Sequence, residues 1–359
     1  MFQNVPTGVG ANRRDLRLSR QELRDVLERG AAWAVDRGFG PRDDLECIEE
    51  GGCLPGADAD LVSDRAYSRG QPQLGTLGSG NHFAELQYVA EIYDARVATA
   101  FGLYPDQVTV MIHSGSRGLG HQVCQDHLKT MISAAAKYGI ELPDRQLCCA
   151  PIQSPAGRDY LAAMSAAANF AFANRQVMAH WVRESLAEAL DMSPDQTGVD
   201  TVYDVCHNIA KFETFDIGGA SRRLCVHRKG ATRAYPPGHP KTPEPYRTVG
   251  QPVLVPGDMG RYSYVLVGTE RAMRETFGST CHGAGRRMSR AQARRSVRGR
   301  SLLSDLEASG VHVRATGMAT VAEEMPDAYK DVAEVVRVVH DAGISTRVAQ
   351  LRPIGVIKG

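Results

Sequence analysis

The sequence predicts an α+β fold in which mixed sheets are surrounded by helices. Short apolar strands repeatedly run into loops rich in Gly, Ser and His, long helical patterns lie between them, and residues 224–268 have a β-like texture. The 359 residues, 43% apolar and 23% charged, have the composition of a globular protein. Length alone suggests about two domains. Because no repeat or low-complexity linker divides the chain, we predict one domain over residues 1–359.

The first predicted element is a helix that begins at a capping box. Ser19-Arg20-Gln21-Glu22 carries the capping pattern, with Leu18 and Leu23 placed for a hydrophobic staple. Apolar residues then follow helical spacing to about Val35. The Gly, Asp and Pro content of residues 38–70 predicts mostly loop.

The middle of the chain alternates between strands and helices. We expect a buried strand over 108–112 that ends at His113, a helix over 119–138, and one long helix or two over 158–190. A further strand over 202–206 is expected to deliver His207 and Asn208.

The remainder of the chain is predicted from shorter patterns. Strands are expected at 224–227, 252–255 and 262–267, helices at 289–297 and 328–340, and a closing strand at 348–358.

Charge and composition limit the possible classes of function. The net charge of +1 argues against a non-specific coat of nucleic acid, although a local basic groove remains compatible with it. No apolar run approaches the roughly 18 residues of a membrane span, and the N-terminus lacks a signal-peptide pattern. The eight cysteines show no CxxC pair, so no disulfide framework is expected. We therefore expect a cytoplasmic protein without a membrane partner.

Four histidines share one kind of sequence context. His82, His113, His207 and His282 each lie near a predicted strand end, beside Gly, Asn or Ser. Neutral imidazoles from separate strands commonly hold a transition metal. A single histidine of this kind is more often structural, but four in matching contexts favour a functional site.

His282 differs from the other three because a basic cluster follows it. Seven arginines fall within residues 286–300, after a glycine-rich turn. An imidazole beside arginines suits covalent phosphoryl or nucleotidyl transfer, in which the ring attacks and guanidinium groups hold phosphate oxygens. The alternative is a solvated basic helix with a capping histidine.

Several weaker signals accompany the histidines. The Gly/Ser loops at 75–80 and 114–120 could present backbone N–H groups to an anion, although neither is a Walker A motif. Glu85 could accept from a guanine-like N–H edge, or could be a surface carboxylate. Lys358 ends an apolar strand, which suggests a contact with the site rather than a solvated tail.

Together these motifs resemble the RtcB family of RNA-splicing ligases, in the family's order and over most of the chain. The similar segments are Gly78-Ser79-Gly80-Asn81-His82-Phe83, His113-Ser114-Gly115-Ser116-Arg117-Gly118-Leu119-Gly120-His121, Asp204-Val205-Cys206-His207-Asn208, His227-Arg228-Lys229-Gly230-Ala231-Thr232, Cys281-His282-Gly283-Ala284-Gly285-Arg286 and residues 353–359.

The resemblance implies a GTP- and Mn²⁺-dependent ligase. Such an enzyme joins an RNA 3′-phosphate, or a 2′,3′-cyclic phosphate, to a 5′-hydroxyl, and two manganese ions are expected. His282 matches the nucleophile that carries GMP, and His82, His113 and His207 match metal-binding histidines. The matching guanylate-site positions are Asn81, Glu85, Pro256, Gly257, Asp258, Met259, Ser263, Gly283, Ala284, Gly285 and Lys358.

The chain departs from the family pattern in two places. The family's N-terminal segment carries an Asp-x-x-Cys-Gly-type motif that also binds the metals, and we expect that segment to lie before Met1. Cys47 and Cys53 lie in predicted loop and are expected to lack an Asp-x-x-Cys context, so neither is expected to replace it. Asp258 stands where the family usually has Ser, and an unpaired carboxylate there would repel a nucleotide phosphate.

Three hypotheses follow from this pattern. The first is an RNA ligase whose upstream portion is missing from the sequence. The second is a catalytically impaired relative that binds RNA ends or GTP but lacks part of the metal site, and the third is a metal-dependent phosphoesterase. The retained nucleophile, arginine cluster and terminal lysine favour the first.

Overall fold

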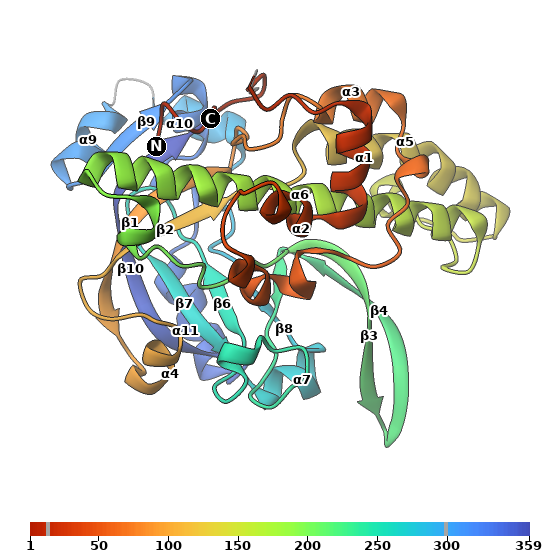
Figure 1. Ribbon diagram of the computed structural model, residues 1–359. Coiled ribbons are helices and arrows are strands. Elements are labelled where there is room, and N and C mark those ends of the chain that lie inside the picture. Colours follow the sequence, from red (N-terminus) through yellow and green to blue (C-terminus); the bar gives the residue numbers. More distant parts are fainter. Residues whose placement is uncertain (12–14, 298–300) are drawn as a thin grey trace.

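A six-stranded sheet surrounded by helices confirms the predicted α+β architecture (Figure 1). The computed structural model describes residues 1–11, 15–297 and 301–359. In the sheet, the strands are ordered β2-β1-β10-β7-β6, and β9 pairs with β10 outside this path. Their bounds are β1 Phe83–Ile92, β2 Val108–His113, β6 Pro252–Val255, β7 Ser263–Gly268, β9 His312–Ala315 and β10 Ser345–Lys358.

Strand β10 lies inside this sheet and organises it. It pairs antiparallel with β1 and β7 and parallel with β9. The register places Phe83 of β1 opposite both Lys358 and His113. His82, His113 and Lys358 therefore lie at the same end of the sheet, at the ends of three neighbouring strands.

A single long helix, α6 (Pro155–Leu190), crosses the molecule and separates the sheet from a helical layer (Figure 1). Its alanine-rich surface allows α1, α2 and α5 to pack closely, and its Phe170 and Val177 join their buried cluster. The bounds of the helices are α1 Arg20–Arg29, α2 Ala31–Asp36, α3 Asp64–Gly70, α4 Ala95–Ala100, α5 Arg117–Lys137, α7 Glu270–Thr276, α8 Arg290–Ser296, α9 Leu302–Ala308, α10 Met318–Glu323 and α11 Val332–Asp341.

A long hairpin of two strands projects beside the sheet (Figure 1). It consists of β3 (Asn208–Ile217) and β4 (Ala220–Lys229), and the chain turns between them at two glycines with positive φ. Immediately after the hairpin, β5 (Ala231–Arg233) pairs with β8 (Ser279–Cys281). This second pairing brings the root of the hairpin next to His282.

Most predicted elements occur, with shifts at their ends. The capping box at Ser19 is present, but the first helix stops at Gly30, whose positive φ separates α1 from α2. Residues 158–190 lie in one helix. Residues 38–70 contain α3 and three short 3₁₀ helices in addition to loop. The organisation of residues 1–359 as one domain stays a prediction.

The predicted strand over 202–206 is wrong. This segment forms only an isolated bridge between Ile48 and Asp204, and the true strand begins at Asn208. The apolar run is buried by tertiary contacts and not by a ladder, as Tyr203 shows with 6% exposure. Burial without regular pairing gives the same sequence pattern as a short core strand.

Candidate active site

The four predicted histidines lie together. The Nε2 atoms of His113 and His207 are 3.0 Å apart, and the ring of His207 stacks on that of His282 with centroids separated by 4.3 Å. His82 stacks beside His113 at 5.9 Å between centroids. The chain thus brings imidazoles from four separate segments into one row.

Burial keeps these imidazoles neutral. Desolvation lowers the pKa of His82 to about 4 and that of His207 to about 3, and it holds the pKa of His113 well below its usual range. The pKa of His282 is lowered too, mainly by burial, with Lys229 acting in the same direction. At neutral pH the rings therefore present lone pairs to electrophiles or metal ions.

Two buried ring nitrogens have no hydrogen-bond partner within the described residues. They are Nδ1 of His207 and Nδ1 of His282. An unpaired polar atom at such depth costs free energy, which a bound ligand can recover. His82 differs, because its Nδ1 accepts a hydrogen bond from the backbone N–H of Gly78 at 3.2 Å.

An arginine of α6 fixes the loops that carry His113 and His207. The Arg175 Nε donates to both carboxylate oxygens of Asp204, at 2.7 and 2.8 Å, and its Nη1 donates to the carbonyl of Ser114 at 3.3 Å. Ser114 directly follows His113. One guanidinium therefore ties both loops to the same rigid helix.

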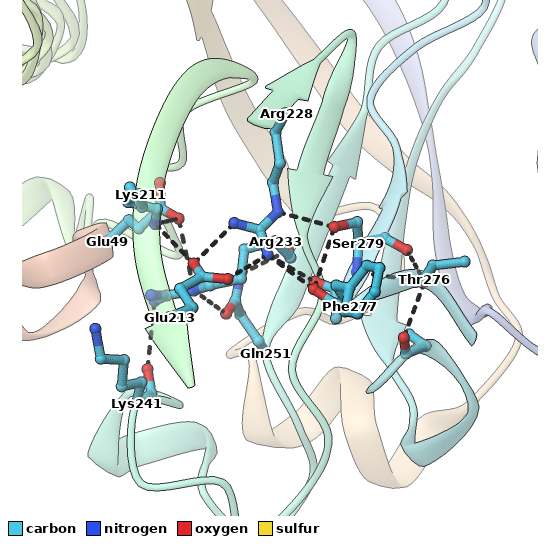
Figure 2. A network of polar contacts seen from close by, with 12 residues as sticks. Glu49, Lys211, Glu213, Arg228, Arg233, Lys241, Gln251, Thr276, Phe277 and Ser279 are labelled. Carbon is cyan, nitrogen blue, oxygen red and sulfur yellow. Dashed lines mark hydrogen bonds and ion pairs between the residues drawn. The ribbon is translucent and has the colours of Figure 1, made fainter. Parts of the chain in front are cut away.

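A buried network of charges anchors the root of the hairpin behind these histidines (Figure 2). The Glu49 carboxylate accepts from the backbone N–H of Cys206 at 2.9 Å, pairs with Lys211 of β3, and lies 3.5 Å from the Nε of Arg233. Because Cys206 directly precedes His207, this carboxylate holds the backbone that positions the histidine. The adjacent cations keep the pKa of Glu49 low despite complete burial.

The same network continues along the hairpin. The guanidinium of Arg228 forms a bidentate pair with Glu213, with two N–O distances of 2.8 Å, and donates to the carbonyl of Phe277 at 3.0 Å (Figure 2). Glu50 pairs with Arg233 at 2.6 Å and with Lys241 at 3.1 Å. Buried bidentate pairs of this kind fix geometry more firmly than exposed ion pairs do.

Two cations near the histidines are not neutralised by a carboxylate in the described part of the chain. Arg117, at the start of α5, donates to Thr76 Oγ1 at 3.0 Å and to the carbonyl of Gly8 at 2.7 Å. Burial lowers its pKa to about 10, and its field lowers the pKa of His82. Lys229, on the exposed edge of β4, is the second. Neutral rings beside unneutralised cations suit an anion.

The predicted guanylate positions Glu85 and Lys358 lie on adjacent strands. Glu85 is only 4% exposed, so its interpretation as a surface carboxylate is wrong, and burial raises its pKa to about 8. The Lys358 Nζ is also buried and donates to the carbonyl of Gly80 at 3.1 Å. Asn81 follows in the same turn and lines the cavity at the site.

The predicted loop at residues 256–260 contacts the turn after His282. The Ala284 N–H donates to the carbonyl of Pro256 at 3.3 Å, and the Gly257 N–H faces Ser263 Oγ at 3.4 Å. A Cβ on Gly257 would lie 2.0 Å from the carbonyl of Tyr262, so this close turn requires glycine. The structure does not test guanylate binding by this loop. Guanylate binding at Met259, Gly283 and Gly285 likewise stays a prediction.

Asp258 is turned into its own loop. Its Oδ1 accepts from the Gly260 N–H at 3.0 Å, and its Oδ2 lies 3.5 Å from the Nε of Arg261. Burial raises the pKa of Asp258 to about 6. Only Oδ1 is hydrogen-bonded within the loop, and the buried Oδ2 has no hydrogen-bond partner among the described residues, so the phosphate repulsion expected from the sequence is only partly relieved by Arg261.

The arginine cluster after His282 is partly neutralised. Arg286 pairs with the buried Glu324 at 3.0 Å, and Arg294 pairs with Glu323 at 3.3 Å. Arg290 lies 3.5 Å from Glu324. These pairs favour the structural interpretation for part of the cluster. Arg298 and Arg300 lie outside the described residues.

The row of histidines opens into a cavity of about 1660 Å³. The cavity extends from His82 and His282 along β2, α5 and α6, and reaches the hairpin at His227 and Lys229. This volume exceeds that of a typical small-molecule pocket. It leaves room for a substrate much larger than a nucleotide.

The described residues fit a metal only in part. His113 and His207 offer two neutral nitrogens at close range, but no group of three or more His, Cys, Asp or Glu in residues 1–11, 15–297 and 301–359 could hold an ion. The expectation that Cys47 lacks an Asp-x-x-Cys context is wrong, because Asp44 and Cys47 have this spacing. Asp44 nevertheless pairs with Arg183, and Cys47 faces Tyr246. They do not replace the ligands implied by the resemblance.

Sequence reasoning missed the residues that support the site. Arg175, Asp204 and Glu49 lie far apart in sequence and acquire a role only when α6, the 202–206 segment and a 3₁₀ helix meet. Arg117 stands in a quoted motif but was assigned no role. The one sequence feature that marks these supporting residues is that each is a charged residue within an otherwise apolar or glycine-rich segment.

The fold and site define a class: a mixed α+β protein with a buried row of neutral histidines beside unneutralised cations. The sequence model of the RtcB family, described as tRNA-splicing ligase RtcB, matches residues 1–359. The chain belongs to this family.

Several curated relatives carry the name tRNA-splicing ligase RtcB. The relative from Archaeoglobus fulgidus is 58% identical over all of this chain and 74% of its own length. The relatives from Thermococcus kodakarensis and Methanococcus maripaludis are 55% and 51% identical over the whole chain, which covers 74% and 75% of their lengths. In the part of this chain that the structure describes, no helix is long and apolar enough to cross a membrane.

Replacing Glu49 with Gln should destabilise the protein strongly. The substitution removes the negative charge between the buried side chains of Lys211 and Arg233, a loss that typically costs about 3–5 kcal/mol. Urea denaturation would measure the free energy of unfolding. The matched control is Glu28→Gln, which removes an exposed pair with Arg24 and should cost below about 1 kcal/mol. Equal effects of the two substitutions would contradict the structural role of Glu49.

Asp258 should make stability depend on pH. Burial raises its pKa in the folded state to about 6 from the ordinary value of 3.8, so its protonation favours the folded state. The stabilisation that this protonation gives to the folded state is complete below about pH 4 and is lost as the pH rises through about 6. Asp258→Asn should flatten this slope and raise the free energy of unfolding at pH 7.5 by about 1–3 kcal/mol. Parallel pH slopes for the two proteins between pH 4 and 7 would exclude this assignment.

Proposed function

We propose that this protein is a GTP- and Mn²⁺-dependent RNA ligase that works through a histidine–GMP intermediate. It joins RNA ends carrying a 3′-phosphate or 2′,3′-cyclic phosphate to ends carrying a 5′-hydroxyl. The observation that carries the proposal is the neutral, buried His282, stacked on His207 and adjacent to cations. Membership of a family whose relatives are named tRNA-splicing ligases supports it.

The proposed chemistry begins with His282. A nitrogen of its neutral ring attacks the α-phosphorus of GTP, a P–N bond forms, and the P–O bond to the departing pyrophosphate breaks. The lowered pKa of His282 keeps its lone pair available at neutral pH. The unneutralised charges of Lys229 and Arg117 lie close enough to the histidines to influence their pKa values, and they would attract phosphate oxygens.

Two transfers complete the ligation. An oxygen of the RNA 3′-phosphate attacks the GMP phosphorus, so the P–N bond breaks and the ring of His282 is regenerated. The 5′-hydroxyl then attacks the activated 3′-phosphate, loses its proton, and displaces GMP as a 3′,5′-phosphodiester forms. A cyclic phosphate must first be opened by water to give the 3′-phosphate.

The buried polar residues at this end of β1 and β10 are proposed to recognise guanine and its sugar. Glu85, with its pKa raised to about 8, would bind a guanine N–H edge as a carboxylate once ligand replaces water. Lys358 and Asn81 lie beside the same turn. The remaining polar atoms of GMP would contact Ser263, the backbone of the loop at Pro256, Gly257, Asp258 and Met259, and the backbone of the 283–285 turn.

The proposed manganese site draws on His113, His207 and His82. Bound Mn²⁺ would supply positive charge to phosphate oxygens. His113 and His207 are neutral and closely spaced, as metal binding requires, whereas the Nδ1 of His82 is already used by Gly78. The proposal therefore requires that further ligands complete the coordination.

One observation favours a second candidate function. In the described residues, no group of three or more possible ligands is arranged to hold a metal ion. A catalytically impaired relative that binds RNA ends or GTP would have this property. Location in the cytoplasm belongs to the main proposal.

The assignment of His282 can be tested by covalent labelling. Incubation of the protein with α-³²P-labelled GTP and Mn²⁺ should leave acid-labile label on the chain, because a phosphoramidate hydrolyses in acid. His282→Gln should reduce the label to background. His312→Gln, at an exposed histidine on β9, should label like the parent. Full labelling of His282→Gln would show that another residue is the nucleophile.

Metal binding can be measured without activity. Electron paramagnetic resonance of free Mn²⁺ should show signal loss on addition of the protein, and His113→Gln should weaken binding at least about tenfold. His312→Gln serves again as the control. If His113→Gln binds Mn²⁺ as tightly as the parent, the metal assignment is wrong while the nucleophile assignment stands. If the parent itself binds none, the second candidate function is favoured.

A further inference from the structure

We propose that one face of the β3–β4 hairpin holds a single-stranded segment of RNA and leads it toward His282. The inference rests on the proposed function and deepens it, because it assigns the surface that takes the polynucleotide. The surface is called the hairpin strip and consists of Phe212, Arg223, Cys225, His227 and Lys229.

The two faces of the hairpin differ in burial and charge. Side chains alternate between faces along each strand, and the pairs Phe212 with Cys225 and Ala210 with His227 lie on one face. The opposite face carries Lys211, Glu213 and Arg228, which are buried against the body of the protein. The hairpin strip is therefore the open face.

The hairpin strip continues directly from the active site. Lys229, at its inner end, acts electrostatically on both His207 and His282. His227 and Cys225 follow and, like Lys229, line the same cavity as the four histidines. Arg223 lies six residues beyond Lys229, so the strip is about 20 Å long at the usual rise of a strand.

The outer end of the hairpin strip combines an aromatic ring with a cation. The Phe212 ring is 38% exposed, and the Arg223 guanidinium lies 4.6 Å from its centroid. No carboxylate of the described residues pairs with Arg223, and Asp216 on this face accepts instead from the Gly219 N–H at the hairpin turn. The strip therefore carries positive charge that remains available to a partner.

This combination favours single-stranded RNA over an acidic peptide. Proteins bind single strands with aromatic rings, on which bases stack, and with cations that contact the backbone phosphates. An acidic peptide would use Arg223 and Lys229 but would gain little from the exposed ring of Phe212. Continuity with the histidines also places the end of a bound strand at the nucleophile.

The buried face keeps the hairpin strip in position. The Arg228 guanidinium, held within the hairpin by its bidentate pair with Glu213, donates to the carbonyl of Phe277 and so attaches the hairpin to the body (Figure 2). The ring of Phe215 packs on that of Phe277 with centroids 5.3 Å apart. A surface held in this way loses little conformational entropy when RNA binds.

Two neighbouring arginines provide the test. Arg223 lies on the hairpin strip, whereas Arg222, opposite Phe215 in the register, points to the other face and is also exposed to solvent. Fluorescence anisotropy with a labelled single-stranded RNA would give the dissociation constant of the full chain. Arg223→Ala should weaken binding about tenfold and reduce the dependence of log K on log salt by about 0.7. Arg222→Ala should stay within about twofold of the parent.

A second variant tests the stacking contact. Phe212→Ala should weaken RNA binding about tenfold without changing the salt dependence, and Phe212→Trp should retain affinity. GTP labelling of His282 without RNA should be unchanged in all these variants. If the parent protein is not labelled by GTP, the proposed function is wrong. If labelling is normal but Arg223→Ala and Phe212→Ala bind RNA as tightly as the parent, only the role of the hairpin strip is wrong.

Two other outcomes would also overturn the inference. Equal weakening by Arg222→Ala and Arg223→Ala would show that only total charge matters. If Arg223→Ala weakened the binding of poly-glutamate but not the binding of RNA, the surface would bind an acidic protein partner instead.

Discussion

The Glu49 carboxylate is the contact on which the geometry of the site depends. It is fully desolvated, and it is stable there only because Lys211, Arg233 and the Cys206 backbone N–H surround it. Through Cys206 it fixes the backbone that carries His207. Through Lys211 and Arg233 it joins β3 to β5, which in turn pairs with the strand that precedes His282. A single buried charge thereby links two of the four histidines.

Burial determines the protonation state of the histidines themselves. Desolvation disfavours protonation of the row, so the rings remain nucleophilic or ligating at neutral pH although they line an open cavity. The positive charge of the site comes instead from Arg117 and Lys229, which cannot act as nucleophiles while protonated. This division separates the group that would attack phosphorus from the groups that would hold its oxygens.

The sequence contained enough information to locate the histidine site but not its supports. His82, His113, His207 and His282 were identified because glycine-rich loops at strand ends are a local signal, and the structure brings all four together. The hairpin was only half predicted. β3 alternates buried charged residues with exposed ones, as Lys211 shows, and this pattern does not resemble an ordinary strand.

Long-range contacts explain the remaining errors. The segment at 202–206 is apolar because it is buried, yet its partner is a loop near Ile48 and not a neighbouring strand. The sequence left open whether Glu85 is a surface carboxylate, because its burial depends on β10, which lies at the other end of the chain. Neither partner can be recognised from local periodicity, because such patterns report burial and not the identity of the covering element.

The position of β10 inside the sheet has a consequence for folding. Its pairing with β1 joins segments far apart in the chain, and the contact between Lys358 and Gly80 spans 278 positions. The entropy of closing so long a loop is lost before the contacts formed can compensate for it. Folding of the sheet must therefore be slow relative to that of the α6 helical layer, and β1 is left as an unpaired edge until β10 arrives. During that interval the exposed edge is a site for aggregation with other unfinished chains.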